Sequence, residues 1–95
     1  MNQNVVRKRC LVRYEGHVQG VGFRFNAVRQ TAGLSVHGYV RNEEDGSVLL
    51  DVEGTALDVN RLLKRIEAEM QDRIEAIQVD ELPLTDATEG FKIRH

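Results

Sequence analysis

The feature that most restricts the fold of this 95-residue chain is a pair of alternating runs on either side of Asp45-Gly46. Residues 35–42 place apolar or small side chains at every second position up to Asn42, and residues 47–53 repeat the pattern. A period of two is typical of a strand with one buried face. Glycine accepts the positive φ that a tight turn requires, so this arrangement predicts a β-hairpin.

Helical periodicity occurs on each side of the predicted hairpin. Between Phe23 and Ala32, apolar residues including Phe25 recur at helical spacing, and Gly33 is suited to end that helix. A second helix is predicted after Thr55, whose side chain can cap it together with Asp58 in a capping box. The apolar stripe of this second helix consists of Val59, Leu62, Leu63, Ile66 and Met70.

Three further strands complete the pattern. Residues 8–15 and 74–82 have the composition of strands, and Phe91 and Ile93 allow a short last strand at an edge. The resulting order, β-α-β-β-α-β, predicts an α+β fold of the ferredoxin-like sandwich type. In that fold an antiparallel sheet is covered on one face by two helices. Because this fold serves many functions, it leaves the activity open.

Composition restricts the class of protein. The length fits a single domain over residues 1–95, with a core over about 8–94. The single cysteine, Cys10, cannot form an intramolecular disulfide and is expected to be a small buried side chain, so we expect a reducing, cytoplasmic location. One cysteine and three scattered histidines predict no metal site. No apolar run has the length of a signal peptide or a membrane span, so we expect no membrane partner.

Charge is unevenly distributed along the chain, although the net charge is only −2. Residues 1–30 carry six basic side chains against one acidic, whereas residues 43–90 carry fourteen acidic against four basic. A basic end attracts small anions, and the acidic remainder would repel a nucleic-acid backbone. Chance clustering on a solvated surface explains the same counts about equally well.

A glycine-rich stretch, Gly16–Gly22, connects the first predicted strand to the first predicted helix. A helix N-terminus offers unpaired N–H groups, and glycines allow further N–H groups to turn inward, which together can hold a phosphate. Arg24 in the first turn could bind two phosphate oxygens. Neither a P-loop nor a dinucleotide fingerprint matches this stretch. On these residues alone, an ordinary glycine-rich turn is slightly favoured.

Two blocks, GHVQGVGFR (16–24) and GYVRNEEDGSV (38–48), closely resemble the signature of the acylphosphatase family in order and spacing. The resemblance covers nearly the whole chain and implies the ferredoxin-like fold. It also implies hydrolysis of an acyl phosphate to a carboxylate and inorganic phosphate, without cofactor or metal. The family's catalytic residues match Arg24 and Asn42. Its phosphate-binding residues match Gly16, His17, Val18, Gln19, Gly20, Val21 and Gly22.

The resemblance implies a simple division of roles. Arg24 and the loop would stabilise the phosphoryl oxygens, while the Asn42 amide would orient a water whose proton passes to the substrate phosphate. The family often has arginine or lysine at the position of His17, whose side chain we expect to face solvent. Phe23 and Phe25 are expected to pack rather than to stack on a ligand. A monomer is expected.

Two other functions are compatible with the same order of elements. One is a non-catalytic acylphosphatase-like domain that binds phosphate or a carbamoyl-phosphate-like ligand, as at the front of a hydrogenase maturation protein. The other is an RNA-binding module, which stacks bases on aromatic side chains of its central strands. The chain offers only Tyr14 and Tyr39 for that purpose, and its net charge is negative.

Overall fold

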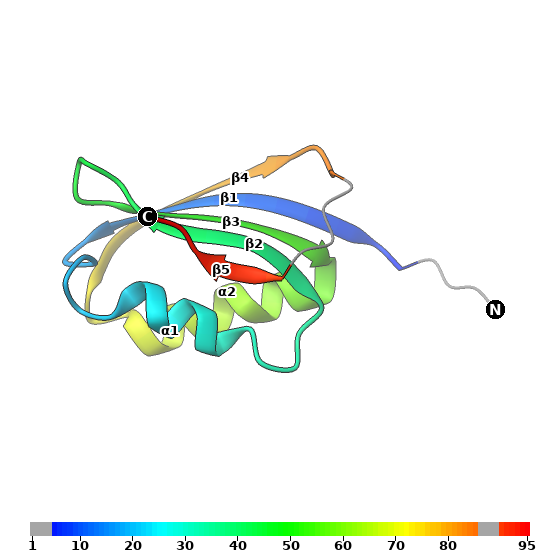
Figure 1. Ribbon diagram of the computed structural model, residues 1–95, viewed down its shortest axis with the longest axis horizontal. Helices are drawn as coiled ribbons and strands as arrows, with labels where there is room; N and C mark the ends of the chain where they lie inside the picture. Colours follow the sequence, from blue (N-terminus) through cyan, green and yellow to red (C-terminus); the bar gives the residue numbers. More distant parts are fainter. Residues whose placement is uncertain (1–4, 86–89) are drawn as a thin grey trace.

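The computed structural model describes residues 5–85 and 90–95, so residues 86–89 of the expected core lie outside the described part. Within it, two helices cover one face of a five-stranded sheet (Figure 1), as the ferredoxin-like prediction requires. No helix in these residues is long and apolar enough to cross a membrane. The elements are β1 (Arg7–Gly16), α1 (Phe23–Gln30), β2 (Val36–Asn42), β3 (Val48–Thr55), α2 (Ala56–Met70), β4 (Ile74–Leu82) and β5 (Phe91–Ile93).

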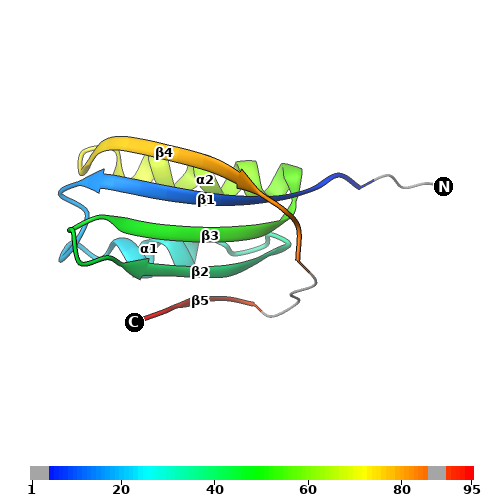
Figure 2. The ribbon, with the colours of Figure 1, turned by 90° about the horizontal axis from the view of Figure 1, so that it is seen from above.

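The strands lie in the order β4-β1-β3-β2-β5 (Figure 2). The first four pair antiparallel, and β2 and β3 form the predicted hairpin. β5, however, runs parallel to β2, so the expectation of a wholly antiparallel sheet is wrong at this edge. The reason is the end of the sheet at which β4 finishes. Leu82, the last residue of β4, pairs with Arg9, Arg9 pairs with Glu53 of β3, and Glu53 pairs with His37 near the start of β2. A chain that returns along β2 from that end must run parallel to it.

The core lies between the sheet and the two helices. Side chains at alternate positions of β1, β2 and β3 face the helices, and the predicted stripe of α2 faces the sheet. Fully buried members are Cys10, Val12, Tyr14, Val40, Val48, Leu50, Val52, Val59, Leu62 and Ile66.

The buried face of α1 is shifted from the predicted one: Val28 of the predicted set packs partly against the core, whereas Phe25 does not. Phe23 and Ala27 are its buried residues, and the Phe23 ring lies 4.8 Å from the ring of Tyr14, measured between centroids. Phe25 is two residues further on, about 200° around the helix axis. Its side chain is 73% exposed, so the expectation that Phe25 packs in the core is wrong.

The start of α2 forms one half of the predicted capping box, because the Thr55 N–H donates to the Ser35 carbonyl at 3.4 Å and not to the Asp58 side chain. The Asp58 N–H donates to Thr55 Oγ1 at 3.2 Å. The Asp58 carboxylate accepts the Ser35 N–H at 2.8 Å, which lowers the pKa of Asp58 below its ordinary value. This carboxylate therefore connects the start of α2 to the segment that precedes β2.

Gly38 is the position where β2 tolerates no side chain. Its φ is +138°, and a Cβ there would lie 1.8 Å from the backbone oxygen of Asp51. We expect Gly38→Ala to lower the free energy of unfolding by about 3 kcal/mol or more, because strain and overpacking add. Gly46→Ala is the matched control: its φ is +93° but the space around it is open, so we expect a loss of about 1–2 kcal/mol. Urea unfolding of both variants measures the difference, and equal losses would contradict the steric argument.

Candidate active site

Two segments distant in sequence meet at one end of the sheet: the loop 16–22 with the start of α1 that follows it, and the turn 43–47. The loop 16–22 leaves β1 there, the turn 43–47 connects β2 to β3 there, and α1 begins beside them (Figure 1). The strand register brings them together, since Tyr14 pairs with Val48, which pairs with Asn42. Adjacent strands of the sheet thus place Asn42 next to the glycine-rich loop.

The backbone of the loop presents unsatisfied hydrogen-bond donors. In the part of the chain that the structure describes, the N–H groups of Val18 through Gly22 donate to no protein acceptor. Gly22 is the N-cap of α1, and no side chain caps that helix, so the N–H groups of its first turn are also open. Gly20 and Gly22 have φ of +76° and +78°, a conformation that disfavours other residues. These donors and the helix dipole together favour an anion.

The beginning of the loop is fixed to the start of β4. The His17 N–H donates to the Arg73 carbonyl at 2.8 Å, so it is already satisfied within the protein. At Gly16, φ is +127° and a Cβ would lie 2.6 Å from the same Arg73 oxygen. Close backbone approach thus explains the glycine at this position. The His17 side chain is exposed, as expected.

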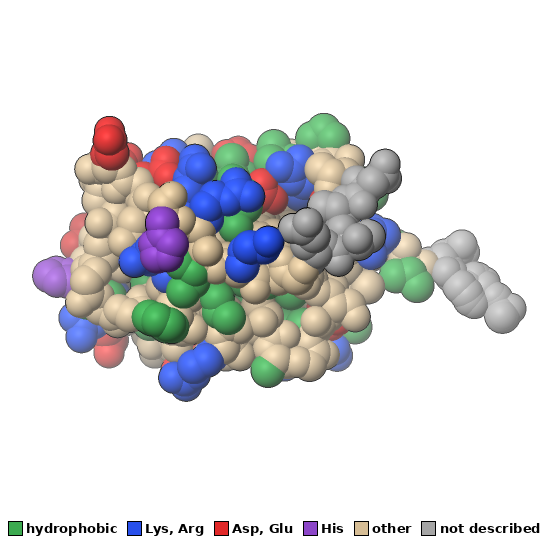
Figure 3. Space-filling view, in the orientation of Figure 1, with side chains coloured by type: hydrophobic (Ala, Val, Ile, Leu, Met, Phe, Trp, Pro, Cys, Tyr) green, Lys and Arg blue, Asp and Glu red, His purple; other side chains and the backbone are tan. Residues whose placement is uncertain are grey.

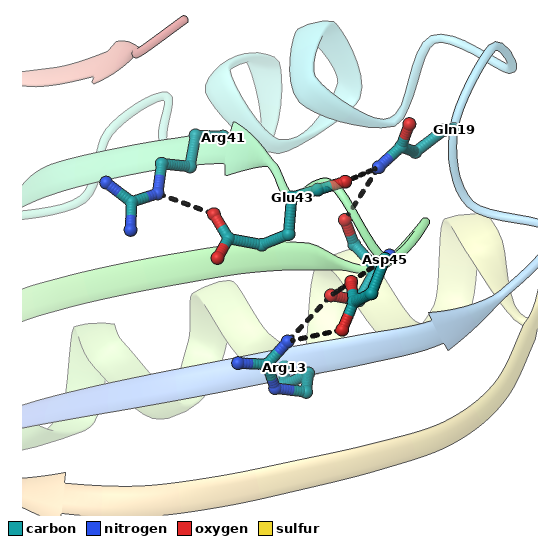
Figure 4. A network of polar contacts seen from close by, with 6 residues as sticks. Arg13, Gln19, Arg41, Glu43 and Asp45 are labelled. Carbon is teal, nitrogen blue, oxygen red and sulfur yellow. Dashed lines mark hydrogen bonds and ion pairs between the residues drawn. The ribbon is translucent and has the colours of Figure 1, made fainter.

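Gln19 joins the loop to the β2–β3 turn. Its Nε2 donates to the carbonyl of Glu43 at 2.7 Å and to that of Ser47 at 2.9 Å (Figure 4). Because Glu43 directly follows Asn42, this amide sets the position of the loop relative to Asn42. Gln19 is one of the predicted phosphate-binding residues. Its side chain makes its hydrogen bonds with the turn.

We expect Gln19→Glu to destabilise the protein. A carboxylate cannot donate to the two carbonyls that Gln19 now satisfies, and it would repel both. The loss in free energy of unfolding should be about 1–3 kcal/mol, measured by urea unfolding. Gln19→Met serves as a control that removes the donors without adding charge, so its loss should be smaller. An unchanged unfolding midpoint for Gln19→Glu would contradict this role.

The turn itself is held by a polar network, also drawn in Figure 4. Asp45 Oδ1 accepts the Ser47 hydroxyl at 2.6 Å and the Ser47 N–H at 2.9 Å, which lowers the pKa of Asp45. Arg13 donates to Ser47 Oγ at 2.8 Å, and Arg41 donates to Glu43 at 2.7 Å. Five side chains therefore stabilise the turn that follows Asn42, and the charges of both arginines are balanced by carboxylates.

Arg24 differs from these arginines in lacking a carboxylate partner. It lies in the first turn of α1, half-buried, and no ion pair within residues 5–85 and 90–95 involves it. Its Nη1 lies 3.4 Å from His95 Nδ1. The positive charge of Arg24 therefore remains available to an anion bound at the loop.

The side chain of Asn42 also faces the loop with an amide that is available for a ligand. Alternation along β2 points its side chain to the same face as buried Val40, toward α1 and the loop, whereas Arg41 points to the other face. Among the described residues its amide makes no hydrogen bond to protein. Asn42 and Arg24 line one hollow of about 170 Å³, here called the Arg24 hollow, together with Val18, Gly20, Gly22, Phe23 and Phe25.

Comparison with known proteins agrees with this geometry. A model of the acylphosphatase family matches residues 10–93.

The chain belongs to the acylphosphatase family.

Among its relatives is an acylphosphatase of Salinibacter ruber, 43% identical over 88 residues, which cover 92% of this chain and 93% of that one. The crystal structure of an acylphosphatase from Bacillus subtilis superimposes with a TM-score of 0.82 over 93% of this chain and 99% of that one. At 22% identity that likeness supports the fold alone. T. kodakarensis HypF matches 93% of this chain with a TM-score of 0.78 and 27% identity, but only 12% of that longer protein. The acylphosphatase assignment made from the sequence is thus confirmed, as is its fold.

The acylphosphatase signature is only partly gathered around the hollow. Arg24, Asn42, Val18, Gly20 and Gly22 line it. The other loop residues in the predicted set lie outside that lining: Gly16, His17, Gln19 and Val21.

Two further groups bear on the chemistry of the site. Cys10 is 1% exposed, and burial raises the pKa of its thiol. Its side chain therefore packs in the core, as expected. Within residues 5–85 and 90–95, no three His, Cys, Asp or Glu side chains are grouped closely enough to hold a metal ion. The groups at the hollow are therefore an arginine, an amide side chain and backbone N–H donors.

Sequence reasoning missed two residues at this acylphosphatase site. Gln19 was identified as part of the loop but not as its connection to the turn, and nothing in the chain pattern pointed to His95 beside Arg24. Its contact depends on β5 lying along β2, with the Arg94 N–H donating to the Val40 carbonyl at 2.9 Å. The sequence provides no direct signal for that pairing.

Proposed function

We propose that this chain hydrolyses a small acyl phosphate to a carboxylate and inorganic phosphate, without a metal ion. Arg24 and the loop Gly16–Gly22 bind the phosphoryl group, chiefly through the free N–H groups of Val18–Gly22, and Asn42 positions the attacking water. The observation that carries the proposal is the Arg24 hollow. There an arginine, an amide and backbone N–H donors line or border one space, and none of them has a carboxylate or hydrogen-bond acceptor partner to balance it among the described residues except the His95 ring beside Arg24.

The proposed chemistry requires little more than these groups. An acyl phosphate is a mixed anhydride whose carboxylate leaves readily, so catalysis consists mainly of positioning and charge stabilisation. Water attacks phosphorus, the bond to the acyl oxygen breaks with its electron pair, and the proton of the water passes to a phosphoryl oxygen. Arg24 and the N–H donors stabilise the equatorial oxygens, while the Asn42 carbonyl oxygen accepts a hydrogen bond from the water.

The remaining parts of the proposal concern partners and location. Inorganic phosphate is the product, the chain acts as a monomer, and the unpaired, buried Cys10 suits the cytoplasm. Nucleic acid is not a proposed partner, because Tyr14 is only 1% exposed and faces the core. Tyr39 lies on the other face with the Arg94 guanidinium 4.0 Å from its ring centroid. One aromatic side chain already stacked by an arginine is a poor base platform.

A second candidate function rests on the match to HypF. There a region similar to this chain forms a small part of a longer protein, so the same hollow could bind phosphate or a carbamoyl-phosphate-like ligand without hydrolysing it. The two candidates differ only in whether bound ligand is turned over.

The test is hydrolysis of benzoyl phosphate by the purified protein in the presence of a chelator, with binding of inorganic phosphate measured by calorimetry. We expect hydrolysis to persist under chelation. If activity were lost with the chelator and restored by a divalent cation, the metal-free mechanism would be wrong. Phosphate binding without hydrolysis would instead support the second candidate.

A further inference from the structure

The side chain of Phe25 stands in an unusual place for an exposed phenyl ring. It is 73% exposed, the highest value among the large hydrophobic residues that the structure leaves on its surface. Its position three residues into α1 puts it next to Arg24 at the rim of the Arg24 hollow. Burial of such a ring normally stabilises a fold, and folding leaves that stabilisation unused here.

Further apolar side chains lie on α1 and on the strand β5, which contacts it. In the space-filling view, hydrophobic side chains gather over α1 and β5, with Lys and Arg groups around them (Figure 3). The residues of these two elements that pack partly against the core include Val28, Phe91 and Ile93. A group that leaves the hollow toward α1 would meet the exposed ring of Phe25, which lines it.

On the side of Asn42 that faces the β2–β3 turn, the lining is charged and not apolar. Asn42 also borders a second hollow of about 500 Å³ beside the β2–β3 turn. Its charged lining comprises two arginines and three carboxylates: Arg13, Arg41, Glu43, Glu44 and Asp45. Two of the carboxylates already pair with the arginines, which leaves Glu44 as the uncompensated charge. A negatively charged acyl group would be repelled on this side.

We propose that Phe25 is the acyl-binding residue of the site, and that the protein selects acyl phosphates with an apolar, uncharged acyl group, aromatic ones above all. This inference rests on the proposed hydrolysis. With the phosphoryl group at Arg24 and the loop, the acyl group lies against the Phe25 ring, where ring–ring contact adds to the burial of apolar surface. Specificity then results from attraction at Phe25 and from repulsion at Glu44.

The test compares benzoyl, acetyl and succinyl phosphate as substrates for the wild type, Phe25→Ala, Phe25→Tyr and Leu57→Ala. Leu57 is the matched control, since it is a hydrophobic residue 60% exposed on α2 and lines neither hollow. We expect the wild type to prefer benzoyl over acetyl phosphate in kcat/KM, with succinyl phosphate poorest. Phe25→Ala should lower the benzoyl-to-acetyl ratio about 3–10-fold, mainly through KM. Phe25→Tyr and Leu57→Ala should keep that ratio.

The same experiment separates the inference from the proposed function. An unchanged ratio in Phe25→Ala, or succinyl phosphate as good as benzoyl phosphate in the wild type, would overturn the role of Phe25 while hydrolysis stands. If the wild type hydrolyses none of the three, the proposed function fails. In that case the affinities for benzoylphosphonate and acetylphosphonate, compared with each other, test the acyl-binding role of Phe25. Tighter binding of benzoylphosphonate that is lost in Phe25→Ala supports the acyl-binding role. Equal binding overturns it.

Discussion

Arg24→Ala is expected to abolish phosphate binding and turnover together. Arg24 lines the Arg24 hollow and has no carboxylate partner in the described part of the chain, so its charge is the largest positive contribution that the lining offers to a bound phosphoryl group. Loss of an arginine that stabilises a phosphoryl transition state commonly lowers the rate by about 10³–10⁵-fold. Hydrolysis of benzoyl phosphate and calorimetric titration with inorganic phosphate measure the two effects.

Two variants make the Arg24 experiment specific. Arg29→Ala removes an exposed arginine from the last turn of the same helix, and we expect both phosphate binding and rate to stay near the wild-type values. Arg24→Lys keeps the charge but loses the planar fork that binds two oxygens, so an intermediate rate is expected. Stability should change little in Arg24→Ala, because within residues 5–85 and 90–95 the one polar contact of the side chain is with His95. A variant that still bound phosphate normally would show that the loop alone forms the anion site.

Asn42→Ala is expected to lose rate while it largely keeps phosphate binding. The Asn42 amide is free of protein hydrogen bonds within the described residues, and the backbone around it is held by the β2–β3 ladder and by Gln19. Its removal should therefore leave the loop and Arg24 in place. Loss of one well-placed donor or acceptor in the transition state commonly costs about 10²–10³-fold in kcat. Steady-state kinetics with benzoyl phosphate and titration with inorganic phosphate separate the two quantities.

Asn42→Asp tests whether the amide group of Asn42 is needed, or only a side chain of its shape. The carboxylate has the shape of the amide but places a negative charge beside the phosphoryl group, so phosphate binding should weaken as well. For Asn42→Ala, weaker phosphate binding with an unchanged kcat would mean that Asn42 binds substrate and does not orient water.

Local sequence patterns were sufficient for most of the architecture. The period-two runs around Asp45-Gly46 predicted the hairpin, and the stripe of α2 predicted its buried face. These features depend on residues a few positions apart, because strand and helix periodicity repeat over that distance. Arg24 and Asn42 could also be identified in this way, since a resemblance carried by two short blocks needs no knowledge of the fold.

The direction of β5 and the exposure of Phe25 required the folded chain. β5 runs parallel to β2 because β4 ends at the end of the sheet where β2 begins, which depends on strand order and on no local pattern. Local periodicity predicts that Phe25 packs, because apolar residues recur at helical spacing between Phe23 and Ala32. The actual phase of α1 is set by packing of Phe23 on Tyr14, a contact between two elements.

The same distinction applies to the site. Glycine content and an arginine at a helix start are local properties, so the sequence could indicate an anion site there. The connection of Gln19 to the Glu43 and Ser47 carbonyls, and the contact of Arg24 with His95, join segments 24 or more residues apart. Such contacts depend on which strands become neighbours and how their ends align. Sheet register settles both, and it is fixed only when the whole core packs at once.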